Sequence, residues 1–153
     1  MKIALLIFGL VISPVLMAKD YFVGEITSQQ IMSDFKRFKK HADDVNYTKQ
    51  QLAALAQIED DIQIKVFFGQ WCHDSQREVP RLIQLFDKLN KDNFDVWYYA
   101  LNGRKSDPQN QAEQHEIRRT PTIIVYRDGK EIARVLEFPE KDWPSDLSKI
   151  LML

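Results

Sequence analysis

The chain has 153 residues, of which 44% are hydrophobic, and this length is sufficient for one domain with a full core. Its formal net charge of -1 gives no overall field that would attract nucleic acid or an anionic membrane. Composition therefore predicts a single folded unit and argues against polyanions as partners. Cysteine occurs once, at Cys72, so the chain cannot form an internal disulfide.

The N-terminal residues 1–18 have the pattern of a secretory signal peptide. Lys2 provides a positive start, Ile3–Met17 is uncharged and apolar, and Ala18 is a small residue at the end of the run. Because this run is shorter than the roughly 20 residues that cross a bilayer, we expect cleavage, export to the periplasm or another extracytoplasmic space, and no stable membrane insertion afterwards. Leu16 is larger than a cleavage site prefers, which leaves an uncleaved signal anchor open.

Residues 19–61 are expected to form an N-terminal helical extension. Apolar residues recur at helical spacing over Thr27–Lys40 and predict one amphipathic helix. The basic residues on its other side suit a docking face or, more simply, a solvated surface. Thr48 and Gln51 fit a capping box, which predicts a second helix as far as about Gln57.

Residues 62–153 alternate between strand and helix patterns. The compact apolar run Ile62–Phe68 predicts a buried central strand, and a helix with Pro80 inside it is expected over Asp74–Asn90. Phe94–Leu101 predicts a further strand, and Gln111–Ile117 a short helix.

The C-terminal part has the pattern of a hairpin followed by a helix. Asp128-Gly129 separates the strand candidates Thr122–Tyr126 and Glu131–Leu136, and Trp143-Pro144 begins the closing helix. The complete order predicts an α/β protein with a central mixed β-sheet and helices packed on both of its faces.

Cys72 follows the central strand and precedes a helix, in the segment Trp71-Cys72-His73-Asp74-Ser75. A sulfur at a helix start faces unpaired backbone N–H groups and the positive end of the helix dipole, which favour the reactive thiolate. A protonated His73 would add to this effect, although an exposed side chain without a role is the simpler interpretation. For Ser75, a hydrogen bond to the sulfur and a surface position without function stay equally open.

Three features in order resemble the thioredoxin superfamily: Trp71-Cys72 at a strand end, Pro80 eight residues after the cysteine, and Thr120-Pro121 before an apolar strand and hairpin. The resemblance implies a thioredoxin-like domain over residues 62–153 and a cis peptide bond between Thr120 and Pro121 that lies against Cys72. It also implies a groove for an extended substrate segment beside the thiol, with Trp71, His73, Thr120 and Pro121 as substrate-binding residues.

The chain departs from the thioredoxin pattern at three positions. Ser75 replaces the second cysteine, Val66 stands in place of a buried acid, and Ala100 in place of its lysine partner. We therefore expect an exported thiol–disulfide oxidoreductase that acts through the nucleophile Cys72, with Ser75 as a second catalytic residue and an external resolving thiol. Its expected partners are protein or peptide thiols and disulfides, with glutathione as a candidate co-substrate and no bound cofactor.

Two other interpretations stay open from the sequence. One is a redox-inert thioredoxin-fold module that binds a peptide or protein, and the other is a redox switch in which Cys72 pairs with a second copy or is capped by glutathione. Arg118 and Arg119 could bind a carboxylate, or lie on a solvated surface. No metal is expected, because Cys72 and the histidines His41, His73 and His115 match no structural zinc spacing.

Overall fold

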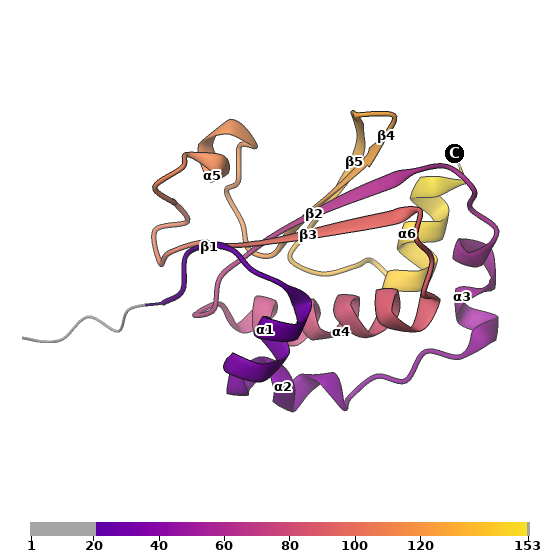
Figure 1. Cartoon of the computed structure of the whole chain (residues 1–153), viewed down its shortest axis with the longest axis horizontal. Helices are drawn as coiled ribbons and strands as arrows, with labels where there is room; N and C mark the ends of the chain where they lie inside the picture. The colour runs from indigo at the N-terminus through magenta and orange to yellow at the C-terminus, as the bar shows by residue number, and fades with distance from the viewer. Residues whose placement is uncertain (1–20, 153) are drawn as a thin grey trace, which may run out of the picture.

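We describe residues 21–152 of a computed structural model of the chain; the predicted signal segment 1–18 lies outside this range. Within the described range one five-stranded sheet has the strand order β1-β3-β2-β4-β5 (Figure 1). The strands are β1 (Gly24–Glu25), β2 (Ile62–Phe68), β3 (Phe94–Ala100), β4 (Thr122–Arg127) and β5 (Lys130–Leu136).

The sheet is mixed, as the order of elements predicted. β2 and β3 run parallel and are joined through the helix α4 (His73–Leu89), whereas β4 pairs antiparallel with both β2 and β5. β2 is the central strand, and its last three residues are fully buried. The buried central strand predicted from Ile62–Phe68 is therefore confirmed, and its carboxyl end leads directly to Cys72.

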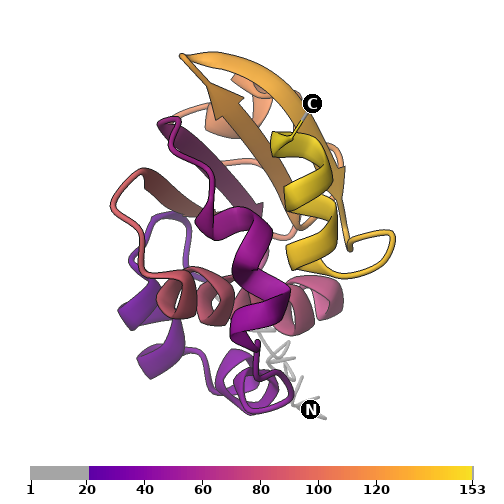
Figure 2. The ribbon, with the colours of Figure 1, turned by 90° about the vertical axis from the view of Figure 1, so that its right-hand side faces the viewer.

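The helices are divided unevenly between the two faces of the sheet. Those packed with Ile64 and Phe68 are α1 (Ser28–Asp34), α2 (Lys36–Ala42), α3 (Lys49–Ala56), α4 and α6 (Trp143–Leu151). Figure 1 shows α1, α2 and α4 as a layer on that side, and Figure 2 shows α3 beside α6. The opposite face is covered by α5 (Gln111–Gln114) and its flanking loops. We call these the helical face and the open face.

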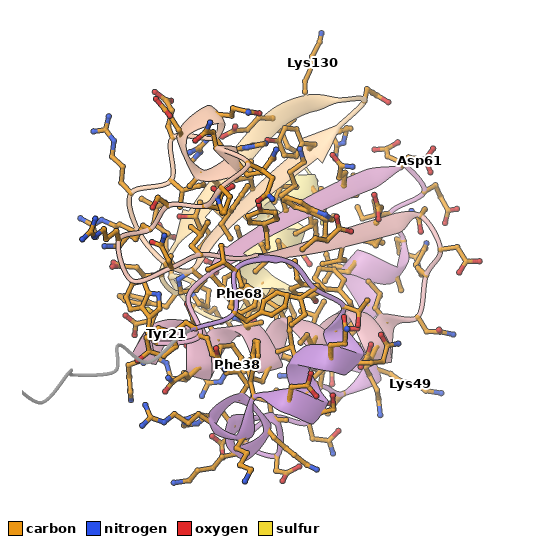
Figure 3. All side chains as sticks on the ribbon, turned by 60° about the vertical axis from the view of Figure 1, so that its left-hand side comes forward. Tyr21, Phe38, Lys49, Asp61, Phe68 and Lys130 are labelled. Atoms are coloured by element: carbon orange, nitrogen blue, oxygen red, sulfur yellow. The ribbon has the colours of Figure 1, made fainter. Side chains whose placement is uncertain are left out.

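The single helix expected over Thr27–Lys40 is wrong, because the chain forms two helices, α1 and α2, separated at Phe35. Phe35 has φ −100° and ψ 86°, which lie outside the helical region. The break lets the rings of Phe35 and Phe38 both pack near Phe68, at centroid distances of 6.4 and 5.6 Å. Phe38 and Phe68 are labelled in Figure 3. Tertiary aromatic packing thus overrides a continuous helical pattern.

Other local predictions are confirmed by the structure. Thr48 and Gln51 form the capping box of α3, and the hairpin turns at Asp128 and Gly129, both with positive φ. The two-residue strand β1, which pairs antiparallel with the end of β3, gave no sequence signal because it is too short to show alternation. No helix within residues 21–152 has the length and hydropathy to cross a membrane.

Candidate thiol site

Cys72 is the N-cap residue of α4 and lies between the end of β2 and the first helical turn. Its φ of −80° and ψ of 126° are the extended values typical of an N-cap, and its backbone N–H donates to the Gly69 carbonyl at 3.0 Å. The thiol is free and half-buried. The placement at a helix start agrees with the sequence prediction.

The Cys72 sulfur contacts a segment that is distant in the sequence. Sγ donates to the Thr120 carbonyl at 3.0 Å, and it makes no hydrogen bond that caps α4. The Thr120–Pro121 peptide bond is cis. The thiol is therefore turned toward the Thr120–Pro121 segment, and the expected contact between the sulfur and the N–H groups of α4 is not formed.

Ser75 lies inside the first turn of α4 and is fully buried, so the surface interpretation of this residue is wrong. Its Oγ accepts a hydrogen bond from the Gly69 backbone N–H at 3.1 Å. The serine thereby satisfies a buried donor in the turn between β2 and Cys72. Burial three residues after the N-cap follows from the helix geometry, which turns this position toward the strand end.

Trp71 is half-buried and has three defined contacts. The indole Nε1 donates to the Leu101 carbonyl at 3.1 Å, and the Lys105 ammonium lies 5.6 Å from the ring centroid. The ring also packs on Gly69, where a Cβ atom would lie 2.6 Å from indole Cε2. Gly69 is required here for close approach of the indole to the backbone.

Sequence reasoning did not identify the two glutamines that support this turn. Gln76, which is buried, donates through Nε2 to the Gln70 carbonyl at 2.9 Å, and Gln70 Oε1 accepts from the Phe22 N–H at 3.0 Å. Together they tie α4, the Trp71–Cys72 turn and the start of the described chain. No local motif distinguishes these glutamines from ordinary polar residues, so only the fold reveals their position.

The remaining predicted residues differ in accessibility. His73 is exposed at the start of α4, whereas Thr120 and Pro121 are buried, so this segment presents its backbone more than its side chains. Arg118 and Arg119 are exposed, and Arg119 forms an ion pair with Glu137 at 2.8 Å. The predicted residues Trp71, Cys72 and Thr120 are therefore brought together, with His73 at the solvent side.

The buried carboxylates within residues 21–152 are Glu78, in α4, which accepts from the Trp143 indole, and Asp107, in the loop that covers the open face. Val66 and Ala100 are fully buried members of the apolar core, which agrees with the loss of the thioredoxin acid and lysine. Asp107, in the loop that covers the open face, accepts from the backbone N–H groups of Gln111 and Ala112 and from the Tyr99 hydroxyl. Although burial opposes ionisation, these hydrogen bonds hold the pKa of Asp107 below its usual value.

No group of three or more His, Cys, Asp or Glu side chains within residues 21–152 is arranged to hold a metal ion.

Comparison with known proteins agrees with this architecture. A family model described as thioredoxin matches residues 24–143, which shows that the chain belongs to the thioredoxin family. The match begins well before Ile62, so it includes α1, α2 and α3. From the sequence, these residues are expected to form an N-terminal helical extension outside the thioredoxin-like domain. The division between residues 19–61 and 62–153 stays a prediction, since residues of both parts share one core.

Individual relatives cover about half of the chain. A thioredoxin of Chlamydia pneumoniae is 31% identical over 83 residues, which is 53% of this chain and 74% of the relative. A thioredoxin of Echinococcus granulosus is 30% identical over 77 residues, or 50% of this chain and 66% of the relative. The crystal structure of a protein of unknown function from Pseudomonas aeruginosa has a TM-score of 0.56 and 16% identity, covering 76% of this chain and 74% of that one.

These results confirm the predicted α/β thioredoxin-like fold. Thioredoxin-family proteins act in general on protein thiols and disulfides, and membership supports a function of the thiol–disulfide oxidoreductase type. The likeness to the Pseudomonas aeruginosa structure concerns the fold alone, because its sequence identity is low.

Proposed function

We propose that this protein is an exported thiol–disulfide oxidoreductase that acts through Cys72 and depends on an external thiol to complete each cycle. The observation that carries the proposal is the position of Cys72, half-buried at the start of α4 with Sγ 3.0 Å from the carbonyl of Thr120. This arrangement joins a helix N-terminus, which favours a thiolate, to a backbone segment that an extended polypeptide could approach.

The first step is attack by the Cys72 thiolate on a substrate disulfide. For a glutathione adduct on a protein, the thiolate attacks the glutathione sulfur, the adduct's S–S bond breaks, and a Cys72–glutathione disulfide forms. The protein sulfur leaves as a thiolate and takes up a proton from solvent. Because the attacking group must be a thiolate, loss of the Cys72 proton and release of the Thr120 hydrogen bond precede this step.

The second step regenerates Cys72 and requires a second molecule. A glutathione thiolate attacks the glutathione sulfur of the mixed disulfide, forms oxidised glutathione and releases the Cys72 thiolate. In sum, one protein–glutathione adduct and one glutathione yield one protein thiol and one oxidised glutathione, a two-electron exchange. Ser75 cannot replace the external thiol, because a hydroxyl forms no disulfide, and its proposed role is to keep the turn before Cys72 in place.

The substrate-binding roles are proposed for the residues around the thiol. Trp71 offers a half-buried indole, His73 an exposed side chain, and Thr120 and Pro121 a backbone edge next to Sγ. The proposed partners are protein or peptide disulfides and adducts, with glutathione as co-substrate. Export rests on the sequence of residues 1–18, and a reporter enzyme that is active only outside the cytoplasm, fused behind residues 1–30, tests it.

The activity test uses a peptide–glutathione mixed disulfide with glutathione, glutathione reductase and NADPH, and follows NADPH oxidation. We expect turnover by the reduced wild-type protein and none above background by Cys72→Ser. Ser75→Ala is the matched control: it removes a hydroxyl but no sulfur, and it should keep most of the activity. Absence of wild-type turnover with glutathione and with a reduced protein thiol would refute the proposed enzyme.

A second candidate function is a redox-inert binding module. The observation in its favour is that Val66 and Ala100 are packed as ordinary core residues, so these two positions supply no acid and lysine to the site. On this account Cys72→Ala leaves partner binding and cellular phenotype unchanged. A loss of either in that variant favours the enzyme.

A further inference from the structure

The helix α5 is too short to be stable by itself, so contacts with the rest of the protein must hold it on the open face. It has four residues, whereas isolated helices shorter than about 12 to 15 residues are marginal in water. Its first turn is held by Asp107, which accepts from the backbone N–H groups of Gln111 and Ala112. Its end is held in a different way, through the side chain of His115.

The two ring nitrogens of His115 have partners whose hydrogen-bonding roles are fixed. Nδ1 lies 2.9 Å from the Gln111 carbonyl oxygen, which can only accept, so Nδ1 carries a proton. Nε2 lies 3.2 Å from the Lys65 ammonium, which can only donate, so Nε2 carries none. Both contacts are satisfied together only by the neutral ring with its proton on Nδ1. The geometry therefore holds His115 in one protonation state.

The Lys65 ammonium is itself held in place beside His115. It lies 5.7 Å from the ring centroid of Trp97 and 5.2 Å from that of Tyr126, and both contacts favour the charged amine. Lys65 makes no ion pair with a carboxylate within residues 21–152. A proton added to Nε2 of His115 would therefore replace the acceptor with a second donor and place two positive charges 3.2 Å apart.

The other charged groups around His115 keep their charge near neutral pH. Arg134 donates to the His115 carbonyl at 3.1 Å and pairs with Glu131 at 2.6 Å. The hydrogen bond from Arg134 holds the pKa of Glu131 below its usual value, so this carboxylate stays ionised. Burial raises the pKa of Tyr99 and of Tyr126, so both phenols stay neutral. Two further acids are exposed on α5 and just after it: Glu113 and Glu116.

We propose that the contact between Lys65 and His115 is a proton-sensitive latch that holds α5 closed over the open face and releases it as the pH falls. The proposal does not depend on the redox chemistry proposed for Cys72. In the closed state the His115 ring packs on Phe67 at a centroid distance of 4.9 Å, and the segment around α5 completes an apolar cluster that contains Phe67 and Ile117. Release of α5 exposes this cluster.

The direction of the pH effect follows from which state binds the additional proton. An imidazole in solution takes up a proton near about pH 6.5, whereas the closed latch excludes it. Because the open state binds one more proton than the closed state, lowering the pH favours opening. At about one pH unit below this value, the equilibrium should shift toward the open state by about ten-fold. The latch is therefore closed at about pH 7.5 and weakened at about pH 5.5.

Amide hydrogen exchange, measured residue by residue, tests the latch in the full chain. The informative N–H groups are those of Gln114, His115 and Ile117, which donate within α5 and the turn after it. After correction for the intrinsic exchange rate, we expect their protection to fall about ten-fold between about pH 7.5 and 5.5. They should also be less protected than the amides of β2 at both pH values. Equal protection in α5 and β2 means that α5 opens only with the whole fold, which overturns the proposal.

Two variants separate the latch from general effects of pH. His115→Gln keeps an acceptor for Lys65 that does not titrate, so the ten-fold change in α5 should disappear, whatever the absolute protection. Lys65→Met keeps the apolar stem between the rings and removes the charge, so most of the change should be lost. The matched control His41→Gln removes a histidine of α2 and should retain the wild-type change. A wild-type pH dependence in His115→Gln contradicts the latch.

Nitrogen chemical shifts of the His115 ring test the same point in the unaltered protein, so the test does not depend on how well the variants fold. At about pH 7.5 we expect the neutral ring with its proton on Nδ1. Uptake of the second proton should coincide with the loss of protection in α5. A proton on Nε2 at about pH 7.5, or full protonation of the ring with no change in α5 exchange, refutes the proposal.

Discussion

The two faces of the sheet are built differently. Within residues 21–152, the helical face is closed by five helices over an apolar core that includes Phe38 and Phe68. The open face has one four-residue helix, and there Lys65 lies half-buried with its ammonium 5.7 Å from the ring centroid of Trp97 and 5.2 Å from that of Tyr126. Charged groups thus take part in covering the open face, whereas the helical face has a large apolar core with a buried carboxylate, Glu78, that accepts from Trp143 between α4 and α6.

The candidate site draws on both faces. Cys72 and Ser75 belong to α4 on the helical face, while Leu101, Lys105 and Thr120 belong to the connection that covers the open face. The nucleophile Cys72 is therefore positioned by the closely packed helical face. The groups that contact Cys72 and Trp71 are positioned by the connection on the open face, which contains only a short helix. Changes in the core of the helical face should therefore have the largest effect on stability, and changes to the groups of the connection that contact Trp71 and Cys72 should affect the site first.

The largest expected loss of stability comes from a substitution on the helical face. Phe38→Ala removes a fully buried ring that packs on Phe35 and Phe68, and should lower the free energy of unfolding by about 4 kcal/mol. Trp97→Ala, on the open face, removes a larger but half-buried ring and should cost about 2 kcal/mol. Urea unfolding of both variants measures the difference, and an equal or reversed order would contradict the contrast between the faces.

The second largest loss of stability is expected in the loop that covers the open face. Asp107→Ala leaves buried N–H groups and the Tyr99 hydroxyl without their acceptor and should destabilise the protein by about 3 kcal/mol. Because the pKa of Asp107 is lowered on folding from its ordinary 3.8, its contribution is present above that value and is lost as pH falls further. Asp107→Asn should therefore flatten the loss of stability below about pH 4, which urea unfolding at several pH values can measure.

A smaller effect is expected where the two layers meet. Gly69→Ala places a methyl group against the indole of Trp71, so the ring must move away from Leu101. We expect a loss of stability of about 1 to 2 kcal/mol and a several-fold fall in kcat, because Trp71 adjoins Cys72. Nuclear magnetic resonance of the Trp71 Nε1–H reports the displacement; an unshifted signal with reduced activity would contradict this cause.

The smallest expected change in stability comes from Ser75→Cys. Sulfur is a weaker acceptor than the hydroxyl for the buried Gly69 N–H, which should cost about 1 kcal/mol. The variant should, however, form an internal disulfide with Cys72 and no longer require an external thiol to resolve the mixed disulfide. Mass spectrometry of the oxidised variant and turnover at low glutathione test this, and Ser75→Ala serves as the control.

Much of the fold could be predicted from the sequence because its signals are local. The apolar run of β2, the capping box at Thr48 and the turn at Asp128 each depend on neighbouring residues, and each is confirmed. The break at Phe35 could not be predicted, since its cause is the packing of Phe35 against Phe68, which comes from another part of the chain. The distribution of helices between the faces likewise depends on tertiary packing.

The candidate site was predictable to the extent that it follows a motif. Trp71, Cys72 and Thr120 lie together, as the resemblance implied, but their roles stay predictions. The supporting contacts from Gln76 and Lys105 were not predictable, because their partners are defined only through space. The burial of Ser75 was also not predictable, because a single serine near a helix start does not indicate whether it faces the core or the solvent.

The packing of Trp71 has a practical consequence for observing the protein at work. Its indole lies against Gly69 and beneath the Lys105 ammonium, one residue before the thiol. Of the other two tryptophans, Trp143 is buried and donates to Glu78, and Trp97 packs beside Lys65 on the open face. An added group on Cys72 should change the surroundings of Trp71 more than those of Trp97 or Trp143, which are not adjacent to the thiol in the sequence. The chain therefore carries its own optical reporter, and the formation and loss of each mixed disulfide can be followed in real time through tryptophan fluorescence, without a label.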